Sequence, residues 1–478
     1  MTSDLMGNTA TESRTRDPWK VFGLLAVVQF MVVLDTGIVY VALPSIQRQM
    51  DFSPAGLAWV MDAYMLAFGG FMLVGGRAAD LFGRRRVLLS GLALFAAASL
   101  ACGLSQEAWQ LVTSRALQGL GAAVVAPSAL ALITDLFTEG PDRHKAFGIW
   151  GGLGGLAGAT GVLFGGLLTS IGWQWTFLVN VPVVLIALVA GSRTLPAGRP
   201  GAVGRVDLLG ALTSSAGLCL ALFAVLHGGA SGWGDATTLG SFAGAAVLLG
   251  AFVWRQLSAD APLIPRMLFG LRNVVLGNAG NTATGLLMFG VFFVVSLYLQ
   301  QVRHYEPLQA GLRTMPISVA VFIGSQVSIR LFGKISPVSA LAGGLALQAV
   351  GLLWWGGVLK ADGDILLSFL LPGMVWGLGL GAAIVAAFVV CTSGLQGPVQ
   401  GAASGLVSTT LQVGGALGVA VLTTVSHRGA GARASASVAA HGQGIALLTA
   451  GVIALVAVPL MLWLRSTWRP QGLGEHGH

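Results

Sequence analysis

The sequence predicts an all-α polytopic membrane protein with fourteen transmembrane helices. Of the 478 residues, 55% are hydrophobic and only 9% are charged, whereas an average water-soluble domain has about 25% charged residues. The mean hydropathy is +0.80. Apolar runs of roughly 20 residues recur along the whole chain, and each is long enough to cross the ~30 Å hydrocarbon core as a helix. Together these observations exclude a soluble globular domain.

The first six apolar runs form the N-terminal part of the chain. A polar segment, residues 1–19, precedes them. The first run is too long for a signal-peptide core and has no cleavage site after it, so we expect that helix to stay in the mature protein. The six runs lie at 21–43, 56–76, 87–104, 110–134, 147–169 and 174–193. We expect residues 20–195 to form one six-helix bundle.

The segment PAGRPGAVGRVD interrupts this pattern with proline, glycine and charged residues and marks a domain boundary. Two further runs follow it, so residues 196–272 are expected to hold a linker and an inserted helix pair. Six more runs then make up a second bundle over 273–464, and residues 465–478 form a polar tail. The later runs lie at 207–228, 236–256, 273–300, 309–331, 337–358, 365–391, 402–425 and 444–464.

A weak internal repeat relates the two bundles. LFGRRRVLLSGLAL, residues 81–94, is echoed by LFGKISPVSALAGGLAL, residues 331–347. Small-residue helices that begin near Gly148 and Gly405 correspond in the same way. Helices 2 and 10 correspond, as do helices 5 and 13, so related helices are eight positions apart in chain order. This spacing fits two six-helix bundles separated by an inserted pair. Two related bundles with a site between them at the membrane midplane form the architecture of alternating-access transporters.

The distribution of basic residues predicts the orientation in the membrane. With the N-terminus inside, nineteen of the 26 Lys and Arg residues fall in cytoplasmic segments, six fall outside, and Arg115 lies within a helix. This bias satisfies the positive-inside rule, so we expect both tails in the cytoplasm. The excess of Arg over Lys and the abundance of Ala and Gly indicate a bacterial source, and hence the bacterial cytoplasmic membrane.

Five motifs resemble signatures of one transporter family. GRAADLFGRRR, residues 76–86, resembles the loop between helices 2 and 3 of the major facilitator superfamily, and LVTSRALQGLGAA, residues 111–123, resembles its helix 4 motif. LDTGIVYVALP, residues 34–44, is similar to the helix 1 motif of the fourteen-helix drug:proton antiporters of the EmrB/QacA type. WQWTFLVNVP and GAASGLVSTTLQVGGALGVAVL resemble further stretches of that group. One position departs from the pattern, because Val162 replaces the proline usual in the helix 5 motif.

The resemblance implies the major facilitator fold and drug:proton antiport. The expected function is efflux of hydrophobic toxic compounds or antibiotics, cationic ones among them, driven by the proton-motive force. A proton-coupled transporter of another small solute or metabolite, including an importer, is the alternative, and Val162 leaves it open.

Other function classes have little support in the sequence. The only Gly-Lys pair lacks the other residues of a P-loop, and the helices carry no metal-binding cluster or nucleophile–base pair of an enzyme. The basic residues are scattered, which argues against a nucleic-acid partner. We expect no metal and no cofactor. The expected partners are a small hydrophobic substrate, protons and the lipid bilayer, with the protein acting as a monomer.

Asp35 is the main candidate for proton coupling. It lies within the first apolar run, where an ionised side chain costs at least ~2.5–3.5 kcal/mol on insertion scales. A carboxyl that alternates between burial and a nearby cation can load and release a proton. A carboxylate permanently bound to a helix partner is the alternative.

Two other charged residues are candidates for the same process. Arg115 shares a helix face with Gln118 and Gly119 and needs an acceptor such as Asp35, unless it snorkels to the interface. Asp62 is either a second proton or cation site or a solvated residue at the outer rim of its helix.

The loop after the second apolar run predicts a conformational latch. Gly76, Asp80 and Gly83 allow a tight cytoplasmic turn to approach neighbouring helices, and Asp80 can pair with Arg84 or with a helix N-terminus. We expect this loop to stabilise one conformation and to release it in the other. The alternative for the arginines, Arg84 and Arg86 among them, is that they only anchor the topology.

A substrate cavity is expected to be lined by aromatic and polar side chains. The candidates are Gln29, Tyr64, Phe68, Gln118, Asn180, Asn281, Phe289, Phe293, Tyr298, Trp376, Phe388 and Gln412. Packing within an apolar helix is the alternative explanation for each aromatic residue.

Overall fold

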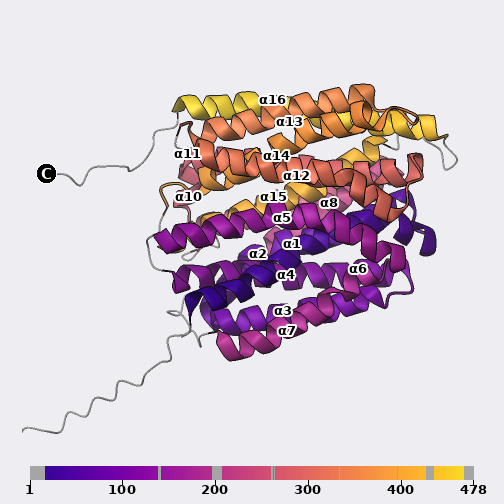
Figure 1. Cartoon of the computed structure of the whole chain (residues 1–478). Coiled ribbons are helices and arrows are strands. Elements are labelled where there is room, and N and C mark those ends of the chain that lie inside the picture. The colour runs from indigo at the N-terminus through magenta and orange to yellow at the C-terminus, as the bar shows by residue number, and fades with distance from the viewer. Residues whose placement is uncertain are drawn as a thin grey trace, which may run out of the picture.

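The computed structural model describes residues 17–137, 141–195, 207–259, 262, 264–332, 334–395, 397–426 and 435–467. Within these ranges all regular structure is helical, as the sequence predicts. Eleven of the described helices are long and apolar enough to cross a membrane. Figure 1 shows the helices side by side, with the start of α1 (Pro18–Gln49) and the end of α16 (Ala436–Thr467) at the same end of the molecule.

The first two helices of the N-terminal half begin with capping side chains and prolines. Asp17 and Ser53 accept hydrogen bonds from the backbone at the starts of α1 and α2, and proline occupies the first turn of both helices. The sixth predicted run is broken at Val179 into two helices. The remaining elements of this half are α2 (Pro54–Phe82), α3 (Arg84–Gly103), α4 (Ala108–Leu136), α5 (Pro141–Ile171), α6 (Trp175–Leu178) and α7 (Asn180–Thr194).

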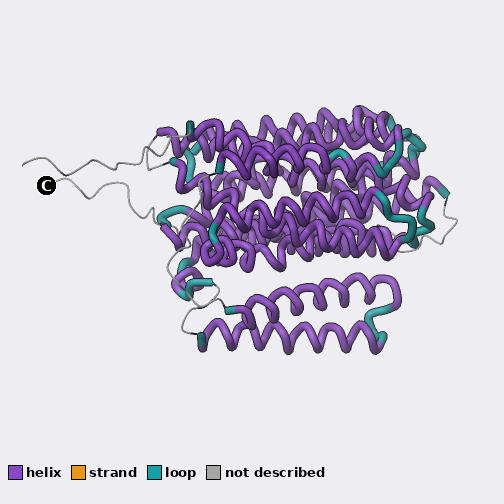
Figure 2. Tube along the Cα trace, turned by 90° about the horizontal axis from the view of Figure 1, so that it is seen from below, coloured by secondary structure: helices purple, strands orange, loops and turns teal. Residues whose placement is uncertain are grey.

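α8 (Leu208–Ser231) and α9 (Ala236–Ser258), which occupy the segment predicted to hold an inserted pair, form a helical hairpin. Asp207 and Asp235 cap the starts of the two helices, and Arg255 of α9 donates to Asp207 at 3.0 Å. α8 packs against α2 and α15, and its Ser215 hydroxyl donates to the Gly70 carbonyl of α2 at 2.5 Å. Figure 2 shows a helical hairpin at the edge of the molecule, in agreement with these contacts.

The C-terminal half contains two π-helical turns, η1 and η2. η2 precedes α14 and lies inside a run predicted as a single helix, whereas η1 continues α11 across the predicted end of its run at residue 300. α5 and α16 begin several residues before their apolar runs, because polar residues continue the helices beyond them. The elements are α10 (Met267–Gly270), α11 (Arg272–Leu297), η1 (Tyr298–Val302), α12 (Pro307–Leu331), α13 (Pro337–Val358), η2 (Leu366–Leu370), α14 (Leu371–Thr392), α15 (Gly397–Ser426) and α16.

Close helix crossings occur at related places in the two halves. A Cβ on Gly75 of α2 would clash with the backbone of α4, and one on Gly119 of α4 would clash with the backbone of α2. α12 and α14 cross in the same way through Gly324 and Gly381. Gly75 and Gly324 are separated by about the same interval as the two echoed segments of the sequence. Small residues at these positions allow the helices to approach each other closely.

Two sets of contacts join the halves. α2 packs on α15, and α5 packs on α12. In addition, the Ser296 hydroxyl donates to the Tyr40 carbonyl at 2.5 Å, and the Gln300 amide donates to the Val41 carbonyl at 2.9 Å. These bonds connect the C-terminal part of α1 to α11 and η1.

Candidate functional site

Asp35 and Arg115 form an ion pair in the interior of the N-terminal half. Asp35 lies in the middle of α1 and Arg115 in the first part of α4. The guanidinium Nη1 donates to Asp35 Oδ2 at 2.7 Å, and both side chains have a relative exposure of 0%. Arg115 therefore does not snorkel to the interface, and that alternative from the sequence is wrong.

Three donors surround the Asp35 carboxylate. Besides Arg115, the amide nitrogen of Gln118 donates to Oδ1 at 2.9 Å, and the amide nitrogen of Asn180 donates to Oδ1 at 2.6 Å. Gln118 is fixed in turn, because its nitrogen also donates to Ser99 at 2.8 Å and its oxygen accepts from Arg115 at 2.6 Å. The carboxylate thus accepts three hydrogen bonds, one on Oδ2 and two on Oδ1.

Arg115 has further partners that do not depend on Asp35. Its Nε donates to the Val60 carbonyl at 2.9 Å. The guanidinium carbon lies 4.2 Å from the ring centroid of Tyr64 and 5.7 Å from that of Phe177. Two aromatic faces thus attract the cation.

The break between α6 and α7 positions Phe177 and Asn180 at the ion pair. Phe177 lies in the single turn of α6, and Asn180 is the first residue of α7. The indole of Trp173, just before α6, donates to Gln49 at the end of α1 at 2.8 Å. The Trp173 carbonyl accepts from the Thr176 hydroxyl at 2.6 Å. These bonds fix the segment that enters the site.

Asp62 of α2 is fully buried, so the solvated rim position considered for it is wrong. Neither of its carboxyl oxygens has a hydrogen-bond partner. The hydroxyl of Tyr40 in α1 is likewise buried without a hydrogen-bond partner. An acid in this setting is accommodated best in its protonated, neutral form.

The turn between α2 and α3 requires glycine at one of its two predicted positions. Gly83 has a φ of +91°, which glycine adopts without steric cost. A Cβ on Gly76 would meet only the Cβ of Pro127 at 3.6 Å, an ordinary contact. The close approach expected at Gly76 is therefore wrong, and it occurs one residue earlier, at Gly75. The side chains of Asp80 and Val162 lie outside the described residues.

Arginines at the start of α3 connect it to its neighbours. Arg84 pairs with Asp135 near the end of α4 and donates to a main-chain carbonyl of α4 at 2.9 Å. Arg85 donates to the Ser192 carbonyl of α7. Arg86 is exposed. Two of the three arginines thus make specific contacts at this end of the half.

The residues predicted to line a substrate cavity separate into four groups. Gln118, Asn180 and Tyr64 belong to the ion-pair site. Tyr298 and Trp376 are buried within the C-terminal half. Asn281, Phe289 and Gln412 lie at the crossings of α15 with α11 and α2, while Gln29, Phe68, Phe293 and Phe388 are distributed over α1, α2, α11 and α14. The structure brings the first group together around Asp35, and the ring of Phe68 contacts that of Tyr64 with centroids 5.7 Å apart.

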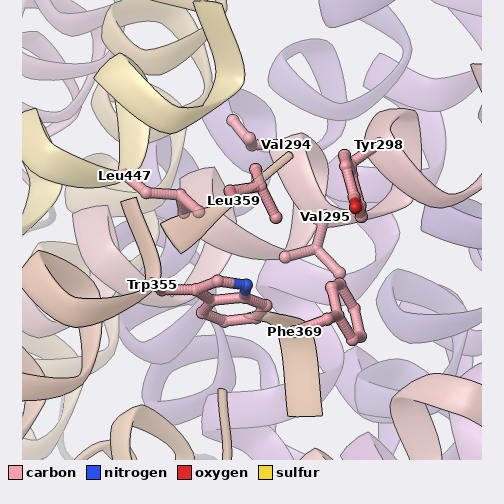
Figure 3. Close-up of a pocket in the computed structure, with 7 residues that line it drawn as sticks. All are labelled: Val294, Val295, Tyr298, Trp355, Leu359, Phe369 and Leu447. Carbon is pink, nitrogen blue, oxygen red and sulfur yellow. The ribbon is translucent and has the colours of Figure 1, made fainter. Parts of the chain in front are cut away.

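Tyr298 lines a narrow apolar pocket inside the C-terminal half (Figure 3). Its phenol donates to the Lys360 carbonyl at 2.7 Å, and its ring stacks on Phe369. The lining residues are Val294, Val295, Tyr298, Trp355, Leu359, Phe369 and Leu447. No charged side chain lines this pocket. Within the described part of the chain, no cluster of three His, Cys, Asp or Glu residues could hold a metal ion.

Several contacts of the ion pair do not follow from the sequence. The helical spacing places Gln118 on the face of Arg115, but it does not show that Gln118 and Asn180 bind Asp35. Ser99 and Phe177 are not predicted at all. A usable signal for Asn180 is that it is a polar residue in an apolar helix, because a buried amide requires a hydrogen-bond partner.

The chain is similar to antibiotic resistance and export proteins. The profile of the Major Facilitator Superfamily matches residues 25–419. The puromycin resistance protein pur8 of Streptomyces alboniger is 37% identical, with 96% of this chain and 94% of that protein aligned. The cephamycin export protein CmcT of Amycolatopsis lactamdurans is 38% identical, with 94% of both aligned. The tetracenomycin C resistance and export protein of Streptomyces glaucescens is 36% identical, with 85% of this chain and 75% of that protein aligned.

Solved transporter structures share the fold. A bacterial homologue of the human lysosomal transporter Spinster, inward-facing and unoccupied, has a TM-score of 0.66 at 17% identity and covers 95% of this chain and 99% of its own. The xylose transporter XylE from E. coli, partially occluded and inward open, has a TM-score of 0.64 at 13% identity and covers 93% and 97%. The family and these relatives indicate a multi-pass membrane transporter of small molecules and not an enzyme. The chain belongs to the Major Facilitator Superfamily.

Proposed function

We propose that this protein exports hydrophobic, antibiotic-type compounds across the bacterial cytoplasmic membrane in exchange for protons. The observation that carries the proposal is the fully buried pair of Asp35 and Arg115 in a membrane transporter. The relatives named for resistance to or export of puromycin, cephamycin and tetracenomycin C support the class of substrate and the outward direction.

Asp35 is the proton carrier in this proposal. The arrangement described here suits the ionised carboxylate, because Arg115 and two amides donate to it. When a proton from the outside neutralises Asp35, Arg115 still has the Val60 carbonyl and the Tyr64 ring as partners. The guanidinium is therefore not left unpaired in an apolar interior. Proton and substrate exclude each other if each stabilises a different conformation.

The hydrogen bonds that join the two halves involve α1, the helix that carries Asp35. Tyr40 and Val41 lie within two turns of Asp35 on α1, and their carbonyls accept from Ser296 and Gln300. With the N-terminus in the cytoplasm, these bonds close the outer end. Opening to the outside must break them, and a change in the charge of Asp35 acts on the same helix. The turn at Gly83 and the pairing of Arg84 lie at the opposite, cytoplasmic end.

The topology belongs to the proposal as well. Both tails lie in the cytoplasm, and fourteen spans of the EmrB/QacA type form two bundles, 20–195 and 273–464, with a peripheral pair within 196–272. The protein works as a monomer. The bias of the basic residues supports the orientation, and the packing of α8 on α2 and α15 supports the peripheral pair. α6 with α7, α11 with η1, and η2 with α14 each count as one span.

Proton movement in proteoliposomes tests the proposal. With a pH gradient imposed and a pH dye enclosed, addition of puromycin or another transported antibiotic should release protons through the parental protein. Asp35→Asn should abolish this exchange while it leaves folding and membrane insertion intact, because the amide cannot carry the proton. Asp51→Asn, the same change at an exposed turn residue, is the matched control and should exchange at the parental rate. Exchange at that rate by Asp35→Asn would refute the assignment.

A further inference from the structure

Asn180 donates a hydrogen bond to Asp35, but its own side-chain oxygen accepts none. Its Nδ2 donates to Asp35 Oδ1 at 2.6 Å, whereas its own Oδ1 is buried and has no hydrogen-bond partner. Buried side-chain polar atoms usually have a partner, so this oxygen requires an explanation. A half turn of the amide about its last bond would exchange the nitrogen and the oxygen. The unpaired oxygen would then lie against the Asp35 carboxyl.

The two other side chains that donate to Asp35 cannot offer it an acceptor atom in this way. The Arg115 guanidinium has only donors. The Gln118 amide is held at both ends, since its nitrogen donates to Asp35 and Ser99 and its oxygen accepts from Arg115. Turning Gln118 would break these three bonds and also the one that its oxygen accepts from the Cys102 thiol at 3.8 Å. Of the three ligands, only Asn180 can change from donor to acceptor without loss of other bonds.

We propose that the Asn180 amide switches from donor to acceptor when Asp35 binds its proton, which makes Asn180 a positioning residue for proton coupling. This inference rests on the proposed function, in which Asp35 carries the proton. With Asp35 ionised, the Asn180 nitrogen faces Oδ1, as described above. When a proton taken from the outer water binds to Oδ1, the new O–H group needs an acceptor, and the turned Asn180 oxygen supplies it.

The switch keeps the number of hydrogen bonds constant. In either orientation one polar atom of the Asn180 amide is bonded to Asp35 and the other is unpaired. A fixed donor at this position would instead oppose the hydrogen of the protonated acid, and the buried O–H would lose its partner. The two protonation states of Asp35 are thus matched in hydrogen bonding, which lets the proton be both bound and released.

The ionisable groups around Asp35 do not replace this role. They are Arg115 of α4, Tyr64 of α2 and Cys102 of α3, and Cys102 contacts Gln118 at 3.8 Å. Arg115 keeps its proton throughout. α7 contributes only Asn180, whose amide carries no ionisable proton. In the proposal this amide responds to the proton on Asp35 by turning.

Infrared difference spectroscopy of the protein in nanodiscs, recorded as the pH is lowered, tests the switch. A carboxylic acid band that appears in the parental protein and is absent from Asp35→Asn belongs to protonated Asp35. In Asn180→Leu, which removes donor and acceptor, this band should move to higher wavenumber, and proton exchange should fall roughly two- to tenfold, the equivalent of one hydrogen bond. Asn273→Leu is the matched control. Its amide donates to two main-chain carbonyls of α14 and the following turn, and the change should leave the Asp35 band in place.

A second measurement uses the unsubstituted sequence. With ¹³C in the asparagine side-chain carbonyls, a carbonyl band should shift between high and low pH in the parental protein and should not shift in Asp35→Asn. No shift in the parental protein, or an unchanged Asp35 band in Asn180→Leu, would overturn the switch. If no acid band is lost in Asp35→Asn, the proposed function fails instead, so the two failures are distinguishable.

Discussion

Arg115 donates to Asp35 at 2.7 Å from a position 80 residues further along the chain, and neither side chain is exposed. A buried ion pair adds little net stability compared with apolar residues of similar volume, because removing two charges from water offsets their attraction. The pair is therefore weak evidence for a stabilising role. The proposed gain and loss of a proton by Asp35 during transport gives a better reason for the presence of the pair.

Removing one member of the pair should damage the protein more than removing both. Arg115→Met leaves the charge of Asp35 buried without its cation, so we expect the free energy of unfolding at neutral pH to fall by about 3–5 kcal/mol. The double variant with Asp35→Asn should recover most of this loss, since no charge remains. A double-mutant cycle of chemical denaturation measures the difference.

Arg313→Met is the control for this cycle. Arg313 lies outside the site, and its guanidinium carbon is 4.4 Å from the ring centroid of Tyr305. It should change stability far less, and its effect should add to that of Asp35→Asn. Equal losses in the single and double variants would show that the stranded charge is not the cause.

Asp62→Asn should not lower stability, in contrast to Asp35→Asn. Both carboxyl oxygens of Asp62 lack partners, so the substitution breaks no hydrogen bond and removes a group that is costly to ionise in its site. Asp35→Asn replaces an acceptor of three hydrogen bonds. We expect the midpoint of thermal unfolding in detergent at neutral pH to stay or rise for Asp62→Asn and to fall for Asp35→Asn. A lower midpoint for Asp62→Asn would show that it has a partner in the membrane-embedded protein.

The helices could be predicted from the sequence because a bilayer permits few alternatives. Backbone groups in hydrocarbon must be satisfied within the chain, so an apolar run of about 20 residues becomes a helix. Hydropathy does not reveal how that helix is wound. The break at Val179 and the π turns at 298–302 and 366–370 leave the apolar character of their runs unchanged, and they appear only in the structure.

The charged members of the site could be assigned to it from the sequence, whereas its neutral members could be named only as candidates for a substrate cavity. Asp35 and Arg115 stand out because ionised residues are rare in apolar helices. Asn180 and Gln118 are neutral amides, and nothing in their sequence context separates a ligand of Asp35 from a residue facing a substrate. Their roles depend on α1, α4 and α7 meeting at one point, which is a property of the folded chain.

Gly75→Ala and Gly76→Ala should have different outcomes although the two residues are neighbours. A Cβ at position 75 clashes with the backbone of α4, whereas one at position 76 meets Pro127 at 3.6 Å. A backbone cannot turn aside as a side chain can, so Gly75→Ala forces α2 and α4 apart, and we expect it to cost about 1–3 kcal/mol. Gly76→Ala should be neutral or slightly stabilising, because alanine has the higher helix propensity. Chemical denaturation in detergent measures both, and similar losses would contradict the prediction.

The turn between α8 and α9 should weaken in acid through Asp235, which caps α9. Its carboxylate accepts from the backbone N–H groups of Thr238 at 3.3 Å and Thr237 at 2.9 Å, and His227 lies 3.1 Å away. The backbone bond from Thr238, followed by the bond with His227 and those from Thr237, holds the pKa of Asp235 below its ordinary value of 3.8. Because the folded pKa is the lower one, the stabilisation is complete above the ordinary value and is lost as the pH falls through the folded value. Asp235→Asn keeps an acceptor but no charge, so its thermal midpoint should lie below the parental one at about pH 6 and approach it in acid. Asp51→Asn should show no such convergence, and a difference between Asp235→Asn and the parental protein that stays constant with pH would rule out this origin.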